Sequence, residues 1–175
     1  MVGEIRDHET AAMAIQSALT GHLVLSTLHT NDAASAVTRL LDLGIESYLV
    51  ASSVVGVLAQ RLVRRVCRQC GEPVHSPEEQ IKRLGVDLSE RDLSLLRMGV
   101  GCEACRQTGY SGRVGIFELL VFNDELRELV VQRASANILQ QAAQRGGLRP
   151  LREDGWDKVR AGLTTIEEVL RATKA

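Results

Sequence analysis

The chain has 175 residues, enough for one sizeable domain or for a compact core with a small satellite. Apolar residues make up 45% of it and charged residues 25%, a balance that fits a packed globule and excludes a disordered chain. The net charge of −1 and the 3% aromatic content argue against a protein that binds nucleic acid.

The sequence contains no stretch that predicts a membrane span. Its most apolar stretch, residues 48–59, is too short and too rich in Ser and Gly to cross a bilayer. The N-terminal residues include acidic side chains and lack the basic and apolar regions of a signal peptide. We therefore expect a cytoplasmic protein without direct membrane insertion, which reaches any membrane only through partners.

Residues 1–31 predict the end of a buried strand, a helix over residues 7–20 and a second buried strand. Glu4 directly follows the apolar residues of the first strand. The second strand, residues 23–28, is so uniformly apolar that we expect helices on both of its faces, and His29 follows it. Ligands of open α/β sheets bind beyond the carboxyl ends of the strands. We therefore expect Glu4 and His29 to point into one cleft, as in a nucleotide-hydrolysing core.

Two histidines, His22 and His29, flank the second strand. Their odd separation places the two side chains on opposite faces of a straight strand, so we do not expect them to bind one metal ion together. A lone histidine beside an apolar run is more often a hydrogen-bonded structural residue than a catalytic one. For His22 both interpretations stay open.

Four cysteines, Cys67, Cys70, Cys102 and Cys105, form two CxxC pairs that together supply enough thiolates for a tetrahedral zinc shell. Two disulfides are disfavoured in a cytosolic chain, and a redox motif needs only one pair at the start of a helix. Unrelated buried cysteines are a further alternative. His75 lies close enough in sequence to replace a cysteine, but four thiolates already fill the shell. The filled shell predicts a structural zinc site rather than a catalytic one.

The remaining elements follow from caps and apolar periodicity. We expect Asn31 to cap a helix that ends before Gly44, and residues 114–122 to form a strand after a turn at residues 109–113. Further helices are predicted over residues 46–58, 76–84 and 89–96, and in the tail after Asn123, Ser135, Pro150 and Thr165. In the tail, Ile138, Leu139, Ala142 and Ala143 are expected to face inward, Trp156 to anchor a core, and Thr165 and Glu168 to form a capping box. In the basic run that begins at Arg61, the residues Arg64, Arg65 and Arg68 fit a solvated face.

The segments GEIRDHETA and TGHLVLSTLHTNDA resemble the Walker B and histidine boxes of the type II secretion ATPase family, which includes the type IV pilus assembly ATPases. The segments AQRLVRRVCRQC, CEACRQTGYSGRVGIFELL and REDGWDKVRAGLTTIEEVL resemble the same family in the same order. The resemblance implies an α/β fold: the C-terminal part of a RecA-like P-loop ATPase core with an inserted four-cysteine zinc subdomain and a helical C-terminal tail. It divides the chain into core residues 1–66, metal subdomain 67–108, and a return strand with helical tail 109–175.

The resemblance also implies roles for individual residues. Glu4 would orient the attacking water or support Mg²⁺ through a water molecule. Gly3 stands where ordinary Walker B strands end in Asp, so the choice between general base and metal organiser stays open, and a solvated turn is the alternative. His29 would sense the γ-phosphate. Arg61, in the AQRL segment, would help to position the nucleotide or a neighbouring subunit, and His22 is a weaker candidate for the same region.

A phosphate-binding loop is missing from the sequence, because no Gly-Lys pair occurs in it. We interpret the chain as the C-terminal fragment of a longer ATPase, inactive alone. The family implies a homo-hexamer that uses ATP and Mg²⁺ to drive pseudopilus assembly in type II secretion, working with platform proteins at the inner membrane. Type IV pilus assembly is the alternative. A non-enzymatic zinc-binding interaction module is a contrasting class, supported by the CxxC pairs and the arginine run.

Overall fold

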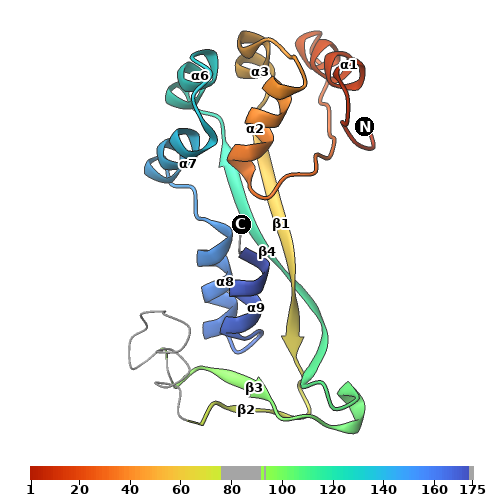
Figure 1. The fold of residues 1–175 in the computed structure, drawn as a ribbon, viewed down its shortest axis with the longest axis vertical. Helices are drawn as coiled ribbons and strands as arrows, with labels where there is room; N and C mark the ends of the chain where they lie inside the picture. Colours follow the sequence, from red (N-terminus) through yellow and green to blue (C-terminus); the bar gives the residue numbers. More distant parts are fainter. Residues whose placement is uncertain (76–91, 93, 174–175) are drawn as a thin grey trace. The chain divides into compact units, whose positions relative to one another are not determined.

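The computed structural model describes residues 1–75, 92 and 94–173 (Figure 1). The chain divides into two compact units. The first comprises Met1–Ala59 and Glu118–Pro150, and the second comprises Gln60–Phe117 and Leu151–Ala175. Two long paired strands, β1 (Gly56–Val66) and β4 (Tyr110–Val121), pass through both units. The three-part division drawn from the sequence stays a prediction.

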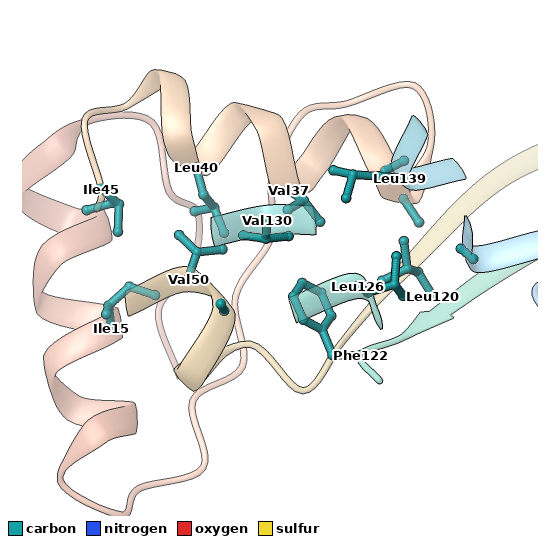
Figure 2. Packing of buried hydrophobic residues seen from close by; sticks show 14 of the residues in the cluster. Ile15, Val37, Leu40, Ile45, Val50, Leu120, Phe122, Leu126, Val130 and Leu139 are labelled. Atoms are coloured by element: carbon teal, nitrogen blue, oxygen red, sulfur yellow. The ribbon is translucent and has the colours of Figure 1, made fainter. Parts of the chain in front are cut away.

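The first unit is built from helices around one apolar core. Its helices are α1 (His8–Leu19), α2 (Ala33–Asp42), α3 (Ser47–Ser53), α6 (Asp124–Val131) and α7 (Ala136–Arg145). Helix α3 packs against α6, and α2 packs against α7. Figure 2 shows side chains of α2, α3 and α6 meeting the end of β4 in this core, among them Val37, Val50, Val130 and Leu120. Burial of these apolar faces provides the main stabilisation of the unit.

Side-chain caps fix where several helices of the first unit begin. Asp7 accepts a hydrogen bond from the Thr10 backbone N–H at 2.9 Å, and Asn123 caps α6 in the same way. The prediction that Asn31 caps α2 was wrong by one residue. Asp32 is the cap, and its side chain accepts from the Ser35 N–H at 2.7 Å.

Two further predictions in this unit were wrong. The helix expected over residues 46–58 ends at Ser53, and β1 begins at Gly56. A side chain at Gly56 would come within 3.0 Å of the Leu120 carbonyl oxygen, so the close pairing with β4 requires glycine. In α7, Ile138 is 47% exposed, because it lies about 100° around the helix axis from the buried Leu139.

The segment at residues 23–28 is extended and lies parallel to the N-terminal segment. Val2 donates its backbone N–H to Leu25 O at 2.9 Å, and Ile5 donates to Thr27 O at 3.0 Å. Val24 packs on the core, whereas Leu23 and Leu25 are 83% and 60% exposed. The expectation that both faces of this segment are covered was therefore wrong for the described residues, which cover only one face.

The second unit contains α8 (Leu151–Arg160), α9 (Ile166–Thr173), the strands β2 (Gly71–Pro73) and β3 (Arg97–Gly99), and the 3₁₀ turn η1 (Glu103–Cys105). The strands β2 and β3 pair antiparallel, with Gly71 opposite Gly99. Trp156 packs against the apolar cluster of this unit, which confirms it as a core anchor. Strand β4 begins at Tyr110, so the turn predicted at residues 109–113 is largely strand.

Two kinds of predicted helix remain to be compared with the structure. The short helices predicted over residues 76–84 and 89–96 fall largely outside the described residues. Among the helices that the structure describes, none combines the length and the apolar character that a bilayer span requires.

Candidate active site and candidate metal centre

The structure brings Glu4 and His29 together at the ends of the two parallel extended segments. The Oε1 atom of Glu4 lies 2.7 Å from His29 Nε2, close enough for an ion pair but not aligned as a hydrogen bond. The Oε2 atom of Glu4 lies 2.6 Å from Arg6 Nη2. The Thr27 hydroxyl donates to Gly3 O at 2.8 Å and ties the two segments together directly before Glu4.

The electrostatics of this pair favour an ionised carboxylate at Glu4. The hydrogen bond from Arg6 lowers the pKa of Glu4, partial burial opposes this, and the charges of Arg6 and His29 lower the pKa further. An ionised carboxylate beside an imidazole can accept a hydrogen bond from water and hold it in a fixed direction. The His29 side chain is 83% exposed, so its ring is accessible to a ligand.

The other two nucleotide-site candidates lie elsewhere. His22 is exposed at the end of α1, where its Nδ1 atom lies 3.2 Å from Ser17 O and 3.2 Å from the Thr20 hydroxyl. These contacts fit the structural interpretation of His22. Arg61 lies on β1 in the second unit, and its guanidinium lies 3.5 Å from Gln60 O. Its predicted role stays a prediction.

The four cysteines form a compact sulfur cluster. Their Sγ atoms all lie within 4.8 Å of one another, and three of the pairs, Cys67–Cys102, Cys70–Cys105 and Cys102–Cys105, are 3.9, 3.8 and 3.7 Å apart. A tetrahedral Zn²⁺ site with Zn–S bonds of about 2.3 Å places its sulfurs about 3.8 Å apart. Three of the sulfur separations therefore match those of a tetrahedral zinc site.

Backbone N–H groups point at the sulfur atoms of the cluster. Cys102 and Gly109 donate to Cys105 Sγ at 3.2 and 3.3 Å. Burial raises the pKa of the Cys105 thiol, but these two N–H groups, together with the thiols of Cys102 and Cys70, lower it by more than this, to about 6. Burial raises the pKa of Cys70 to about 12. A thiol pKa near 6 favours the thiolate, which is the form that binds metal.

Short backbone contacts hold the two cysteine turns side by side. Cys67 donates its N–H to Gly109 O at 2.9 Å, and Val100 donates to Cys70 O at 3.1 Å. Between Cys105 and Gly109 the chain turns sharply, with Arg106 and Gln107 in the left-handed region at φ 54° and 63°. These contacts bring the two CxxC pairs of the sequence to one site.

With this geometry in view, comparison with known proteins identifies the family. Residues 1–171 match the family described as Type II/IV secretion system protein. The chain belongs to this family. This membership confirms the resemblance seen in the sequence motifs, and it covers both the Glu4–His29 pair and the cysteine cluster.

Curated members of the Type II/IV secretion family are similar along nearly the whole chain. The type II secretion system protein HxcR of Pseudomonas aeruginosa is 53% identical over 99% of this chain and 33% of its own length. The type IV pilus assembly ATPase PilB of Thermus thermophilus is 51% identical over 99% of this chain and 20% of its own length. The chain therefore spans about a fifth to a third of these relatives.

The solved structure of the pilus retraction motor PilT with bound ADP is similar in fold. It aligns with a TM-score of 0.64 and 24% identity, over 99% of this chain and 40% of PilT. The crystal structure of the Legionella pneumophila ATPase DotB aligns with a TM-score of 0.60. These neighbours confirm the predicted fold class, an α/β core of the kind found in these ATPases, and the structure of this chain adds the cluster of four cysteines.

Two buried glutamates of this family member were missed as functional candidates in the sequence. Glu118 on β4 is 3% exposed and accepts from the Ala33 backbone N–H, and Glu168 on α9 is 1% exposed and accepts from two arginines. Glu118 lies two positions from the apolar Ile116 and Leu120, so it shares their strand face, and this pattern could have predicted a buried carboxyl group. For Glu168 the capping-box pattern gave a competing explanation.

Proposed function

We propose that this chain is the C-terminal part of the catalytic core of an ATPase that powers type II secretion by driving pseudopilus assembly. The observation that carries the proposal is the contact of 2.7 Å between Glu4 and His29 at the ends of two hydrogen-bonded extended segments. The family match and the ATPase names of the relatives support it. The phosphate-binding loop would come from sequence outside this chain, so the fragment is expected to be inactive alone.

Glu4 is proposed to act on the attacking water of ATP hydrolysis. Its lowered pKa keeps it ionised, so at neutral pH it can accept a hydrogen bond from that water. Mg²⁺, when bound with the nucleotide, would neutralise phosphate charge, and Glu4 is the residue here that would support it through a water molecule. His29 can donate a hydrogen bond to a phosphate oxygen. Arg61 is proposed to position the nucleotide or a neighbouring subunit, and the same role is proposed for His22 as the alternative to a structural one.

The cysteine cluster is proposed to hold one structural Zn²⁺. Four thiolates complete a tetrahedral shell and leave no open position for substrate or water. The sulfur separations of 3.7 to 3.9 Å support this assignment. Cys67, Cys70, Cys102 and Cys105 are the proposed ligands.

The assembly of the full-length protein is proposed to be a homo-hexamer in the cytoplasm, held at the inner membrane by platform proteins of the secretion machinery. Relatives named for type II secretion and for type IV pilus assembly match at 53% and 51% identity, so pilus assembly is the alternative machine. The contact of Glu4 with His29 supports nucleotide hydrolysis in either case.

The Glu4→Gln variant of the full-length protein tests the proposal. We expect kcat for ATP hydrolysis to fall by about 100-fold or more, because the amide cannot accept the proton or hold the charge of the carboxylate. ATP affinity, measured by equilibrium binding of a fluorescent analogue, should change little. The matched control is Glu9→Gln, which makes the same charge change at an exposed position in the first turn of α1.

Two results contradict this function. The first is a Glu4→Gln protein that hydrolyses ATP at the wild-type rate. The second is a wild-type full-length protein that binds zinc but neither binds nor hydrolyses ATP, which would favour the non-enzymatic interaction module.

A further inference from the structure

Glu118 is an acidic residue at an inward-facing position of β4. Its exposed fraction is 3%, and Ile116 and Leu120, two positions away on either side, are both 0% exposed. A carboxyl group in such surroundings is costly unless its oxygens are hydrogen-bonded. The partners of Glu118 therefore indicate what the residue does.

Those partners lie on two helices of the first unit. The Oε1 atom accepts from the Ala33 backbone N–H at 3.0 Å, and Oε2 accepts from Gln140 Nε2 at 3.3 Å. Ala33 is the first residue of α2, whose first N–H groups have no partner within the helix. Asp32 satisfies another of them through Ser35. The carboxyl group of Asp32 and that of Glu118, which is 85 positions from Ala33, therefore fix the start of α2.

The start of α2 is also the end of the loop that carries His29. The loop is short, since His29 precedes Ala33 by only four positions, and the Thr30 hydroxyl donates to Asp32 O at 3.2 Å. Its other end is fixed by the hydrogen bond from Ile5 to Thr27. With both ends held, the loop keeps the His29 ring 2.7 Å from Glu4.

We propose that Glu118 is a positioning residue for His29: its hydrogen bond to Ala33 fixes the start of α2 and thereby the loop that presents the imidazole to Glu4. The inference rests on the proposed ATPase function and adds a residue that acts through its hydrogen bond to the first residue of α2. No sequence motif assigned this role to it.

The first test is steady-state ATP hydrolysis by the full-length protein. Glu118→Ala should lower kcat by roughly 10- to 100-fold, because small displacements of a reacting group are costly, while KM for ATP stays within about twofold. Glu118→Gln keeps an acceptor oxygen for Ala33 and should restore kcat to within about threefold of wild type. The control Gln140→Ala removes the other partner of Glu118 and should leave kcat unchanged.

The second test does not require activity. Diethyl pyrocarbonate modifies accessible imidazoles, and mass spectrometry reports the rate at each histidine. His29 should react several-fold faster in Glu118→Ala, because its ring is no longer held at Glu4, whereas His22 at the end of α1 should react at the wild-type rate. Equal rates at His29 in wild type and Glu118→Ala would overturn the proposal.

A third variant separates positioning from folding. Ala33→Pro deletes the N–H that Glu118 binds and adds ring carbons at a buried position, where proline is favoured by the helix geometry and Asp32 before it is already extended at φ −145° and ψ 175°. It should reproduce the lower kcat and the faster reaction of His29. If Glu118→Ala raises the modification rate of every histidine, the protein has unfolded, and Ala33→Pro becomes the deciding variant. A wild-type kcat and a wild-type His29 rate in Ala33→Pro would then reject the proposal. A wild-type protein without ATPase activity would contradict the proposed function, and the His29 rates would still test the positioning.

Discussion

Removal of zinc is expected to unfold the strands β2 and β3 and the turn η1 in the full-length protein. The strands β2 and β3 have three residues each, and the buried apolar cluster at this site consists of the cysteines themselves. Apart from Leu96, which packs against Val159 of α8 and Ile166 of α9, little except the metal offsets the chain entropy of ordering these strands and this turn. Structural zinc supplies about 10–16 kcal/mol in small zinc domains at neutral pH. We expect one zinc per chain by elemental analysis and, after chelation, loss of amide exchange protection in β2, β3 and η1.

Single substitutions sharpen this prediction. Cys70→Ser should abolish stoichiometric zinc and the protection of β2 and β3, because a hydroxyl is a poor zinc ligand at neutral pH. His75→Ala is the matched control: the sulfur cluster is complete without His75, so zinc content should stay at one per chain. A folded, metal-free wild-type protein with four titratable thiols would contradict the zinc assignment. It would not affect the proposal for Glu4 and His29.

The parts of the site that could be predicted from the sequence are those set by local pattern. Two CxxC pairs and a polar residue directly after each apolar strand are short-range signals, and the structure brings their side chains together. Caps were readable for the same reason, since a cap and its helix are adjacent in sequence. Asn31 and Asp32 are both good caps, and only the backbone geometry chooses Asp32.

The two buried glutamates show what local pattern cannot supply. Glu118 is paired with Ala33 across 85 positions of sequence, and Glu168 with Arg64 across 104. The Thr165-Glu168 capping box was half right: the Thr165 hydroxyl accepts the Glu168 N–H at 3.4 Å, but the Glu168 carboxylate turns to two arginines. The spacing of residues in the sequence does not reveal that the Glu168 carboxylate lies closer to those guanidinium groups than to the N–H groups at the start of α9.

The Glu168 carboxylate is expected to make the stability of α9 depend on pH in the acid range. Burial raises the pKa of Glu168, but hydrogen bonds from Arg171 and Arg64 lower it more, from 4.5 to about 2. A lowered folded-state pKa stabilises the fold above the unfolded pKa near 4.5, and this stabilisation is lost as the pH falls toward 2. The shift corresponds to about 3 kcal/mol at neutral pH. Amide exchange of α9, corrected for intrinsic rates, should show the loss between these values.

Glu168→Gln should remove most of this stabilisation at neutral pH. The wild-type carboxylate accepts from the Arg64 backbone N–H and guanidinium, both at 2.8 Å, and from Arg171 at 2.9 Å. A neutral amide leaves two guanidinium groups without their counter-charge, which costs about 3 kcal/mol. Protection of the α9 amides should fall roughly 100-fold. Glu167→Gln makes the same change at the exposed neighbouring position and should leave protection unchanged. Equal protection in the two variants would show that the Glu168 carboxylate does not hold α9 to β1.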